Sequence, residues 1–259
     1  MLDMLSAEAF SQAHQQLRQP TQSLEDDLQV SLESLTSHGL NSEAETLVND
    51  RSEVKYVMPM EVLPHFLPAL EDEYSVLRFD ERAISTYEIT YFDTPELAHY
   101  HAHHNGHRNR YKYRLRRYAD TGATFLEIKL KNNKGRTIKE RFLWGENESD
   151  NADAKQRLHD RLGDRLQQYA PSLYVNYRRI SFWNQNNGDR LTVDFDLSYQ
   201  RPGEGGVRLP DIFVAEIKRL GKFHGSPFFR RAKSYGYFPK RFSKYCVGVC
   251  LTDNSGIKR

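Results

Sequence analysis

The chain has 259 residues, with 37 Lys and Arg, 35 Asp and Glu, and two cysteines. This length suits one large domain with a small appendage, and two cysteines exclude the disulfide framework of a small secreted protein. The sequence has neither a signal-peptide pattern nor an apolar run approaching the roughly 20 residues that span a bilayer. We therefore expect a soluble, cytoplasmic protein.

The charge is unevenly distributed along the chain. Residues 1–49 hold eight acids and one base, Arg18, for a net charge of −7, which leaves +9 for residues 50–259. We divide the chain into an acidic N-terminal extension (1–49), a basic domain (50–251) and a C-terminal tail (252–259). An excess of positive charge on the domain favours an anionic partner.

The acidic extension contains one helical pattern. Its leucines are spaced for a single helix face that ends near Gly39: Leu24, Leu28, Leu32 and Leu35. A helix this short is marginal alone in water, so it would dock on the domain or on another chain. A disordered leader is the alternative.

From Arg51 onward, β-branched and aromatic residues predict strands at 52–58, 86–92, 110–118, 124–131, 136–144, 174–183, 189–199, 212–219 and 244–251. Turn residues separate several of them at 120–122, 132–135, 186–188 and 201–203. A helix is predicted over 151–169, and short helical pieces interrupted by proline over 60–70. The predicted fold is mainly β, a closed barrel of eight antiparallel strands with a few flanking helices.

Charged residues recur at every second position of these strands. Examples are Glu53/Lys55, Arg114/Arg116, Glu127/Lys129/Lys131, Lys139/Arg141, Arg190/Asp194 and Glu216/Lys218. Residues i and i+2 of a strand point the same way. Such faces can lie in water, as on one side of a sandwich. They can also line a polar barrel interior that holds a highly charged anion.

The order of the motifs resembles the VTC (vacuolar transporter chaperone) polyphosphate polymerase domain of the CYTH-like triphosphate tunnel metalloenzymes. The matching segments span roughly residues 50–251: Glu53–Tyr56, Thr90–Thr94, Lys112–Tyr118, Glu127–Lys129, Lys139–Phe142, Tyr177–Arg179, Arg190–Asp194, Glu216–Lys218 and Phe242–Tyr245. Each segment is a weak signal alone, and together they follow the order of the family.

The resemblance implies a tunnel that binds triphosphate or polyphosphate. It assigns phosphate contacts to Lys55, Arg114, Arg116, Lys129, Arg141, Arg179, Arg190, Lys218 and Lys244. Alternation from Tyr177 and the family pattern both favour Arg179 over Arg178 as the inward residue. Glu216 resembles the carboxylate that binds Mn²⁺ or Mg²⁺. Ser243 and Lys244 match the Ser-Lys pair near the transferred phosphate, and with Lys55, Arg114 and Arg116 they are the candidate catalytic residues.

The resemblance favours an ATP-dependent polyphosphate polymerase. Related triphosphatases carry a Glu-x-Glu metal pair on the first strand, whereas here Lys55 replaces the second acid. Hydrolysis of triphosphates and simple binding of polyphosphate remain alternatives. The acids Glu53, Glu127 and Asp194 are either metal ligands or partners of neighbouring bases. Eukaryotic relatives join such a domain to membrane segments, so either a separate membrane-protein partner or a product free in the cytoplasm is a further expectation.

Three other patterns have competing interpretations. The histidines of residues 99–107 suggest a zinc site, a surface helix, or groups that neutralise an anion. Cys246 and Cys250 read as packed small residues. The interleaved bases and aromatics of residues 110–118 suggest nucleic-acid binding. Strand alternation argues against it, because it places most of the bases on one face and the aromatics on the other.

Overall fold

The computed structural model describes residues 14–15, 22–39, 52–79 and 81–253. The other parts of the acidic extension and of the C-terminal tail lie outside the described residues. None of the helices within these ranges is both long enough and apolar enough to cross a membrane.

The strands are β1 Ser37–His38, β2 Ser52–Pro59, β3 Ser75–Leu77, β4 Ile84–Asp93, β5 Arg110–Tyr118, β6 Thr124–Lys131, β7 Thr137–Leu143, β8 Ala170–Trp183, β9 Arg190–Gln200 and β10 Val207–Arg219. The α-helices are α2 Gln22–Leu32, α4 Leu63–Phe66, α5 Ala98–His104, α6 Ala152–Leu162, α7 Pro227–Ser234 and α8 Lys244–Thr252. Short 3₁₀ turns are η2 Met60–Val62, η3 Pro68–Leu70, η4 Ser149–Asn151, η5 Gly163–Gln168 and η6 Phe223–Gly225.

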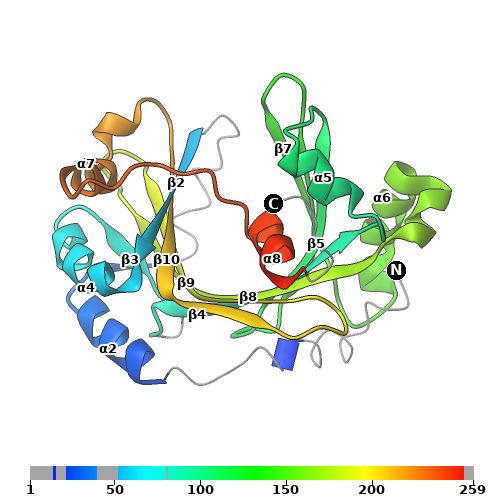
Figure 1. The fold of residues 1–259 in the computed structure, drawn as a ribbon. Coiled ribbons are helices and arrows are strands. Elements are labelled where there is room, and N and C mark those ends of the chain that lie inside the picture. Colours follow the sequence, from blue (N-terminus) through cyan, green and yellow to red (C-terminus); the bar gives the residue numbers. More distant parts are fainter. Residues whose placement is uncertain (1–13, 16–21, 40–51, 80, 254–259) are drawn as a thin grey trace.

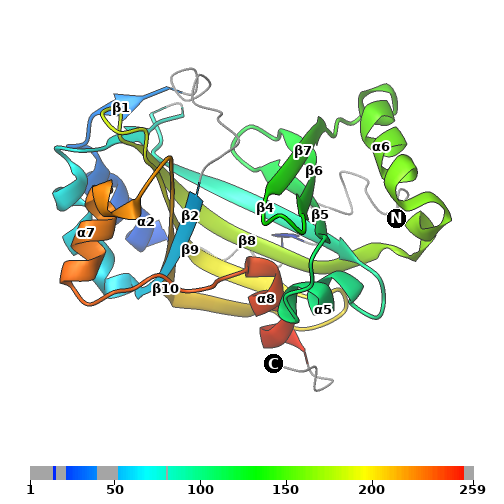
Figure 2. The same ribbon diagram turned by 90° about the horizontal axis from the view of Figure 1, so that it is seen from above.

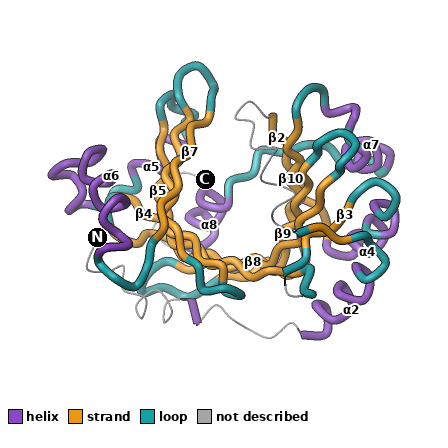
Figure 3. The backbone as a smooth tube through the Cα atoms, turned by 180° about the vertical axis from the view of Figure 1, so that it is seen from behind, coloured by secondary structure: helices purple, strands orange, loops and turns teal. Residues whose placement is uncertain are grey.

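Eight strands form one antiparallel path in the order β2-β10-β9-β8-β4-β5-β6-β7. The sheet bends strongly, so that β2 and β10 form one arm, β5 to β7 form the other, and β8 and β4 lie between them (Figures 1 and 3). Mainly β architecture with eight antiparallel strands is confirmed. The closed barrel is not, because no backbone pairing among the described residues joins β7 to β2.

The free edge of β2 has another partner. The backbone N–H of Lys240 donates to the carbonyl oxygen of Lys55 at 2.7 Å, so the connection between α7 and α8 takes part of the edge that a closing strand would need. At the opposite edge, β7 presents Lys139, Glu140 and Arg141, and charged side chains on an edge strand discourage further pairing.

Helices cover the outer face of each arm (Figure 2). On the β2 arm, α2, α4 and α7 bury an apolar cluster that includes Leu28, Leu32 and Leu35. The helix predicted in the acidic extension is therefore present and docks on the domain. On the β7 arm, α6 packs Leu158 and Leu162 against the sheet. Proline divides residues 60–70 into short helical pieces, as predicted.

The segment 244–251 is a helix, so the strand predicted there is wrong. The side chain of Ser243 accepts the backbone N–H of Cys246 and begins α8 as its N-cap. Tyr245, Gly248, Val249 and Thr252 are buried, which is a helical spacing. Because this apolar stripe packs on the inner face of the sheet, tertiary burial outweighs the strand preference of its Val and Cys residues.

A β-bulge makes room for α8 on the inner face. The register of β8 and β9 shifts between Asn176 and Arg178, where Asp196 has a positive φ of 50°. Before the bulge, Asp194 faces inward; after it, Leu197 and Tyr199 do, and they join the cluster around Tyr245 and Val249. One extra residue thus changes the inner face from charged to apolar along a single strand.

Close packing of α8 gives a stability prediction. A Cβ on Gly248 would lie 2.4 Å from Cδ1 of Tyr199 and 2.6 Å from Cδ2 of Leu173, both of which are buried. We expect Gly248→Ala to lower the free energy of unfolding in urea by about 1–3 kcal/mol, the usual cost of overpacking. Gly205→Ala, with no heavy atom within 4 Å of its added Cβ, is the control. Equal stability of both variants would contradict this packing.

Candidate functional site

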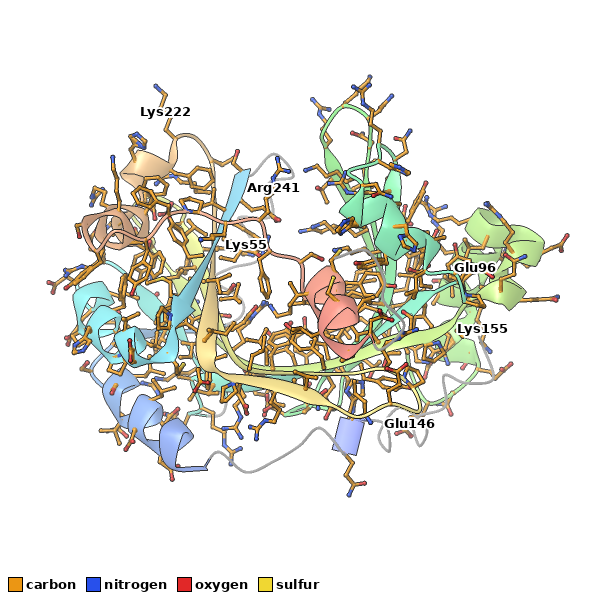
Figure 4. All side chains as sticks on the ribbon, viewed as in Figure 1. Lys55, Glu96, Glu146, Lys155, Lys222 and Arg241 are labelled. Carbon is orange, nitrogen blue, oxygen red and sulfur yellow. The ribbon has the colours of Figure 1, made fainter. Side chains whose placement is uncertain are left out.

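The inner face of the sheet gathers the predicted site residues into rows. Across β5, β6 and β7, Arg114 is paired with Glu127 and Glu127 with Arg141, while Lys112, Lys129 and Lys139 form the next row. On the other arm, Lys55 of β2 is paired with Glu216 of β10. In Figure 4 the Lys55 side chain projects from β2 into the space partly enclosed by the curved sheet.

We call this set of charged side chains the inner cage. It comprises Glu53, Lys55, Lys112, Arg114, Arg116, Glu127, Lys129, Lys139, Arg141, Arg179, Arg190, Asp194, Glu216, Lys218 and Lys244. Its bases greatly outnumber its acids. The arrangement is possible because strand alternation puts the intervening residues, such as Ile128 and Ile217, into the outer apolar layers.

Glu127 holds the first group of bases. Its Oε2 accepts from Nε and Nη2 of Arg114 at 2.8 and 2.5 Å, and lies 3.2 Å from Nη2 of Arg116. Burial alone would raise the pKa of Glu127, but the two guanidinium groups outweigh it and lower the pKa to about 2. Glu127 is therefore ionised across the physiological range, and it pairs with bases, which is one of the two roles that the sequence left open.

Asp194 holds the second group. Its carboxylate accepts from Nε and Nη2 of Arg179 at 2.5 and 2.8 Å, and it also pairs with Nζ of Lys244. Lys244 further lies over the ring of Tyr177, 4.3 Å from its centroid. Arg179 thus reaches the inner cage through Asp194. Arg178 pairs with a different acid, Asp196, with 3.7 Å between its Nε and Oδ2 of that carboxylate. Burial opposes the ionisation of Asp194, yet Arg179 and Lys244 lower its pKa to about 2.

Glu216 holds the third group. It lies 2.5 Å from Nζ of Lys218 and 3.2 Å from Nζ of Lys55, and Lys55 also reaches Glu53 at 2.6 Å. Burial would raise the pKa of Glu216, but Lys218 and Lys55 hold it well below its usual range. Two lysines therefore bracket the carboxylate that is predicted to bind a metal.

The remaining predicted residues complete the two arms. Arg190 begins β9 and is paired in register with Lys218. Arg141 stacks 3.7 Å above the ring centroid of Phe125 and donates to the hydroxyl of Tyr118 at 3.0 Å. Burial is the main cause that lowers the pKa of Lys129, and the acids Glu53 and Glu216 oppose it. The attraction of Glu53 and Glu216 for Lys129 is therefore an electrostatic interaction between the β7 arm and the β2 arm.

Lys112 belongs to the cage but was not among the predicted site residues. Its Nζ donates to Oγ of Ser243 at 2.8 Å, which joins β5 to the start of α8. Burial, aided by the positive charges of Lys129 and Arg114, lowers the pKa of Lys112 to about 7. Strand alternation places Lys112 on the same face as Arg114, so the sequence did contain a signal that Lys112 lies in the site. Its contact with Ser243 required the tertiary fold.

The cage can be tested for its fit to a divalent cation. No group of three His, Cys, Asp or Glu side chains suitable for a metal occurs in the described part of the chain. Mg²⁺ and Mn²⁺ do not need one, because one or two carboxylates, water and substrate phosphates suffice. Glu216 fits this mode with Glu53 as the nearby second carboxylate. Lys55 would then turn from these acids to the phosphates.

The first part of the histidine segment lies in the helix α5, which ends at His104, and the described residues of the segment form no group of three metal-ligating side chains. Nε2 of His99 shares a hydrogen bond with the hydroxyl of Tyr169 at 2.8 Å. Burial, together with Lys112 and Arg110, lowers the pKa of His103 to about 2, so it adds no positive charge to the empty cage. Tyr113, one aromatic of the basic stretch, is only 2% exposed and cannot stack on a nucleic-acid base.

The low pKa of Lys112 predicts that phosphate binding is coupled to proton uptake. At about pH 8 this amine is largely neutral in the empty protein, and a bound polyanion favours its charged form and raises its pKa. We expect inorganic tripolyphosphate to bind with proton uptake at about pH 8 and more weakly as the pH rises. Titration calorimetry in two buffers of different ionisation enthalpy measures this uptake.

The matched variant is Lys112→Met, which keeps the length of the side chain. It should take up fewer protons than the wild type at about pH 8 and the same number at about pH 6, where the lysine is already charged. Equal proton uptake by the two proteins at both pH values would contradict the assignment.

Comparison with known proteins supplies the family. The VTC domain model matches residues 50–252. No curated protein matches the chain. Similar solved structures include a candidate adenylate cyclase from Bacillus halodurans, with 13% identity over 74% of this chain and 92% of that chain, and a TM-score of 0.49. Another is a candidate adenylyl cyclase from Hippeastrum with a dominant triphosphatase activity, with 14% identity over 78% and 97%, and a TM-score of 0.49.

A Pyrococcus horikoshii protein, PH1819, shares 15% identity over 77% of this chain and 98% of that chain, with a TM-score of 0.44. The family model is the match that decides membership, because it covers the whole basic domain from β2 through α8. The resemblance found in the sequence is confirmed: the chain belongs to the VTC domain family.

Proposed function

We propose that this protein is a metal-dependent polyphosphate polymerase that transfers the γ-phosphoryl group of ATP to a growing polyphosphate chain. The observation that carries the proposal is the inner cage, in which arginines and lysines from both arms of the sheet face one another. A linear chain of phosphates is an anion that can contact all of them. Arginine offers a planar fork for phosphate oxygens, and lysine a compact charge.

Each acid of the cage keeps its bases in place until a phosphate arrives. Arg114 and Arg116 are held by Glu127, and Arg179 by Asp194, with their donor groups already directed inward. Phosphoryl transfer requires mainly alignment and charge stabilisation. Preoriented donors supply both, because little side-chain entropy is lost when the phosphates bind.

Lys244 is proposed to stabilise the phosphoryl group in transfer. It begins α8 and is held by Asp194, and Ser243, the N-cap of the same helix, accepts a hydrogen bond from Lys112. Burial lowers the pKa of Lys244 to about 8, against the opposing effect of Asp194. A bound phosphate would raise that pKa, so the amine would carry its charge where negative charge develops.

Glu216 and Glu53 would hold a divalent cation, which would supply positive charge to offset the negative charge of the phosphate oxygens. The choice between Mn²⁺ and Mg²⁺ is left to experiment. In the same fold a triphosphatase would need a strongly activated water, and Lys55 occupies the position where related triphosphatases carry a second acid. Lys55 pairs with both Glu53 and Glu216. This pairing favours transfer to phosphate over hydrolysis.

Hydrolysis of triphosphate and binding without turnover are the competing functions. The proposed setting is the cytoplasm, with ATP and inorganic polyphosphate as ligands. A separate membrane-protein partner that receives the product is part of the proposal. Nucleic acid is not proposed as a ligand, because the inner cage presents few accessible aromatic rings beside its bases.

The first experiment supplies ATP and Mn²⁺ to the purified protein and quantifies ADP, free phosphate and polyphosphate. We expect ADP to be matched by polymer. Lys244→Ala should reduce the rate about 10²- to 10³-fold, the usual loss when one charge-stabilising donor is removed. Lys222→Ala, at an exposed residue outside the inner cage, serves as the control. Free phosphate without polymer would establish a triphosphatase instead.

Metal dependence separates an enzyme from a binding module. Glu216→Gln keeps the shape of the side chain and removes its charge, so we expect transfer to fall about 10²-fold or more while tripolyphosphate still binds. Rate is measured against Mn²⁺ concentration, and binding by calorimetry without metal. If the wild type shows no turnover and Glu216→Gln binds tripolyphosphate as tightly as the wild type does, the protein is a polyphosphate-binding module instead.

A further inference from the structure

The motif Thr90–Thr94 is one of the segments that define the family resemblance. Its Tyr91 accepts a hydrogen bond from Arg114 of the inner cage at 3.2 Å, whereas its acid has other partners. Its acid, Asp93, ends β4 and is only 1% exposed. Oδ1 accepts the backbone N–H of Thr94 at 2.8 Å and of His99 at 2.9 Å. Oδ2 accepts the backbone N–H of Tyr100 at 2.9 Å and the hydroxyl of Tyr245 at 2.5 Å.

Asp93 therefore joins two helices that are distant in the sequence. It satisfies amides in the first turn of α5, where Leu97 stands at the N-cap position and makes no side-chain hydrogen bond. With the same carboxylate it holds the first turn of α8 through Tyr245. Figure 2 shows α5 and α8 side by side at one end of the curved sheet.

Tyr245 follows directly after Lys244, the residue proposed to contact the transferred phosphate. Its ring lies 4.9 Å from the ring of Tyr91, and its hydroxyl also reaches Oγ of Ser172 at 3.3 Å. The side chain is 1% exposed. It is therefore fixed on one side of α8 while Lys244 reaches Asp194 on the inner face.

Two other polar contacts of this turn involve cage residues. Lys244 pairs with Asp194, and Ser243 accepts from Lys112. A bound phosphate would compete for both of these amines. The hydrogen bond from Tyr245 to Asp93 involves no residue of the cage, so substrate binding leaves it in place.

We infer that Asp93 and Tyr245 are positioning residues, whose hydrogen bond fixes the first turn of α8 so that Lys244 meets the transferred phosphate. The inference rests on the proposed function for its catalytic consequence. Its structural part, the attachment of α8 by this bond, can be tested without activity. A small misplacement of a catalytic group can cost about 10²-fold in rate.

The test variant is Tyr245→Phe, which keeps the ring and removes the hydroxyl. Ser172→Ala is the matched control, because it removes the other side-chain partner of that hydroxyl and leaves Asp93 bonded. We expect Tyr245→Phe to lower kcat for phosphoryl transfer about tenfold or more, with KM and tripolyphosphate affinity within about twofold of wild type. Ser172→Ala should keep wild-type kcat. Unchanged kcat in Tyr245→Phe, or equal losses in kcat and affinity, would overturn the inference.

The second readout uses the two cysteines of the chain, Cys246 and Cys250, which are both partly buried free thiols in α8. Under native conditions, labelling of these thiols by an alkylating reagent reports how often α8 leaves the sheet. We expect labelling several-fold faster in Tyr245→Phe than in wild type and Ser172→Ala. Equal labelling rates in all three proteins would overturn the attachment.

The two readouts separate the failure of this inference from failure of the proposed function. If the wild-type protein forms no polymer, the proposed function is wrong. Faster labelling of Tyr245→Phe would still support the attachment of α8 in that case. If the wild type is active, and Tyr245→Phe has the same labelling rate and the same kcat as the wild type, the inference is wrong and the proposed function is unaffected.

Discussion

Repulsion among like charges is the constraint on which the rest of this structure depends. Two unit charges about 4 Å apart interact by about 4 kcal/mol at an effective dielectric constant of 20, and the inner face carries many cations in neighbouring strands. Glu127, Asp194 and Glu216 offset this repulsion, each pairing with two bases. The acids reduce the repulsion because each lies between two bases. The cage still attracts an anion because its bases outnumber its acids.

The inner face of the sheet has a second role, which is to pack against α8 through apolar side chains. The bulge at Asp196 changes which residues of β9 point inward, so that charged side chains occupy one stretch and a packing surface for α8 the next. Gly248 lets the helix approach Tyr199 and Leu173 closely. The charged Lys244 is thereby carried into the cage by a helix whose other side is fully buried. Affinity for phosphate and the position of Lys244 have separate structural origins.

Local pattern predicted much of this site, because alternation along a strand is a property of the strand alone. The inward faces of Lys55, Arg114 and Glu216 follow from it directly. The helix 244–252 was missed because its sequence, rich in Val and Cys, favours a strand, and burial against Tyr199 decides otherwise. The partners of each acid and the open edge of the sheet depend on contacts between distant segments. Local sequence patterns therefore do not predict these contacts.

The pairing of β2 with β10 also has a consequence for how the protein is made. Lys55 of β2 meets Glu216 of β10, and β2 has no other strand partner among the described residues. During synthesis β2 must therefore wait, unpaired, until almost the whole domain has emerged. Such distant pairing slows folding. The cage arginines of β5, β7, β8 and β9 therefore leave the ribosome before the arm formed by β2 and β10 can pair.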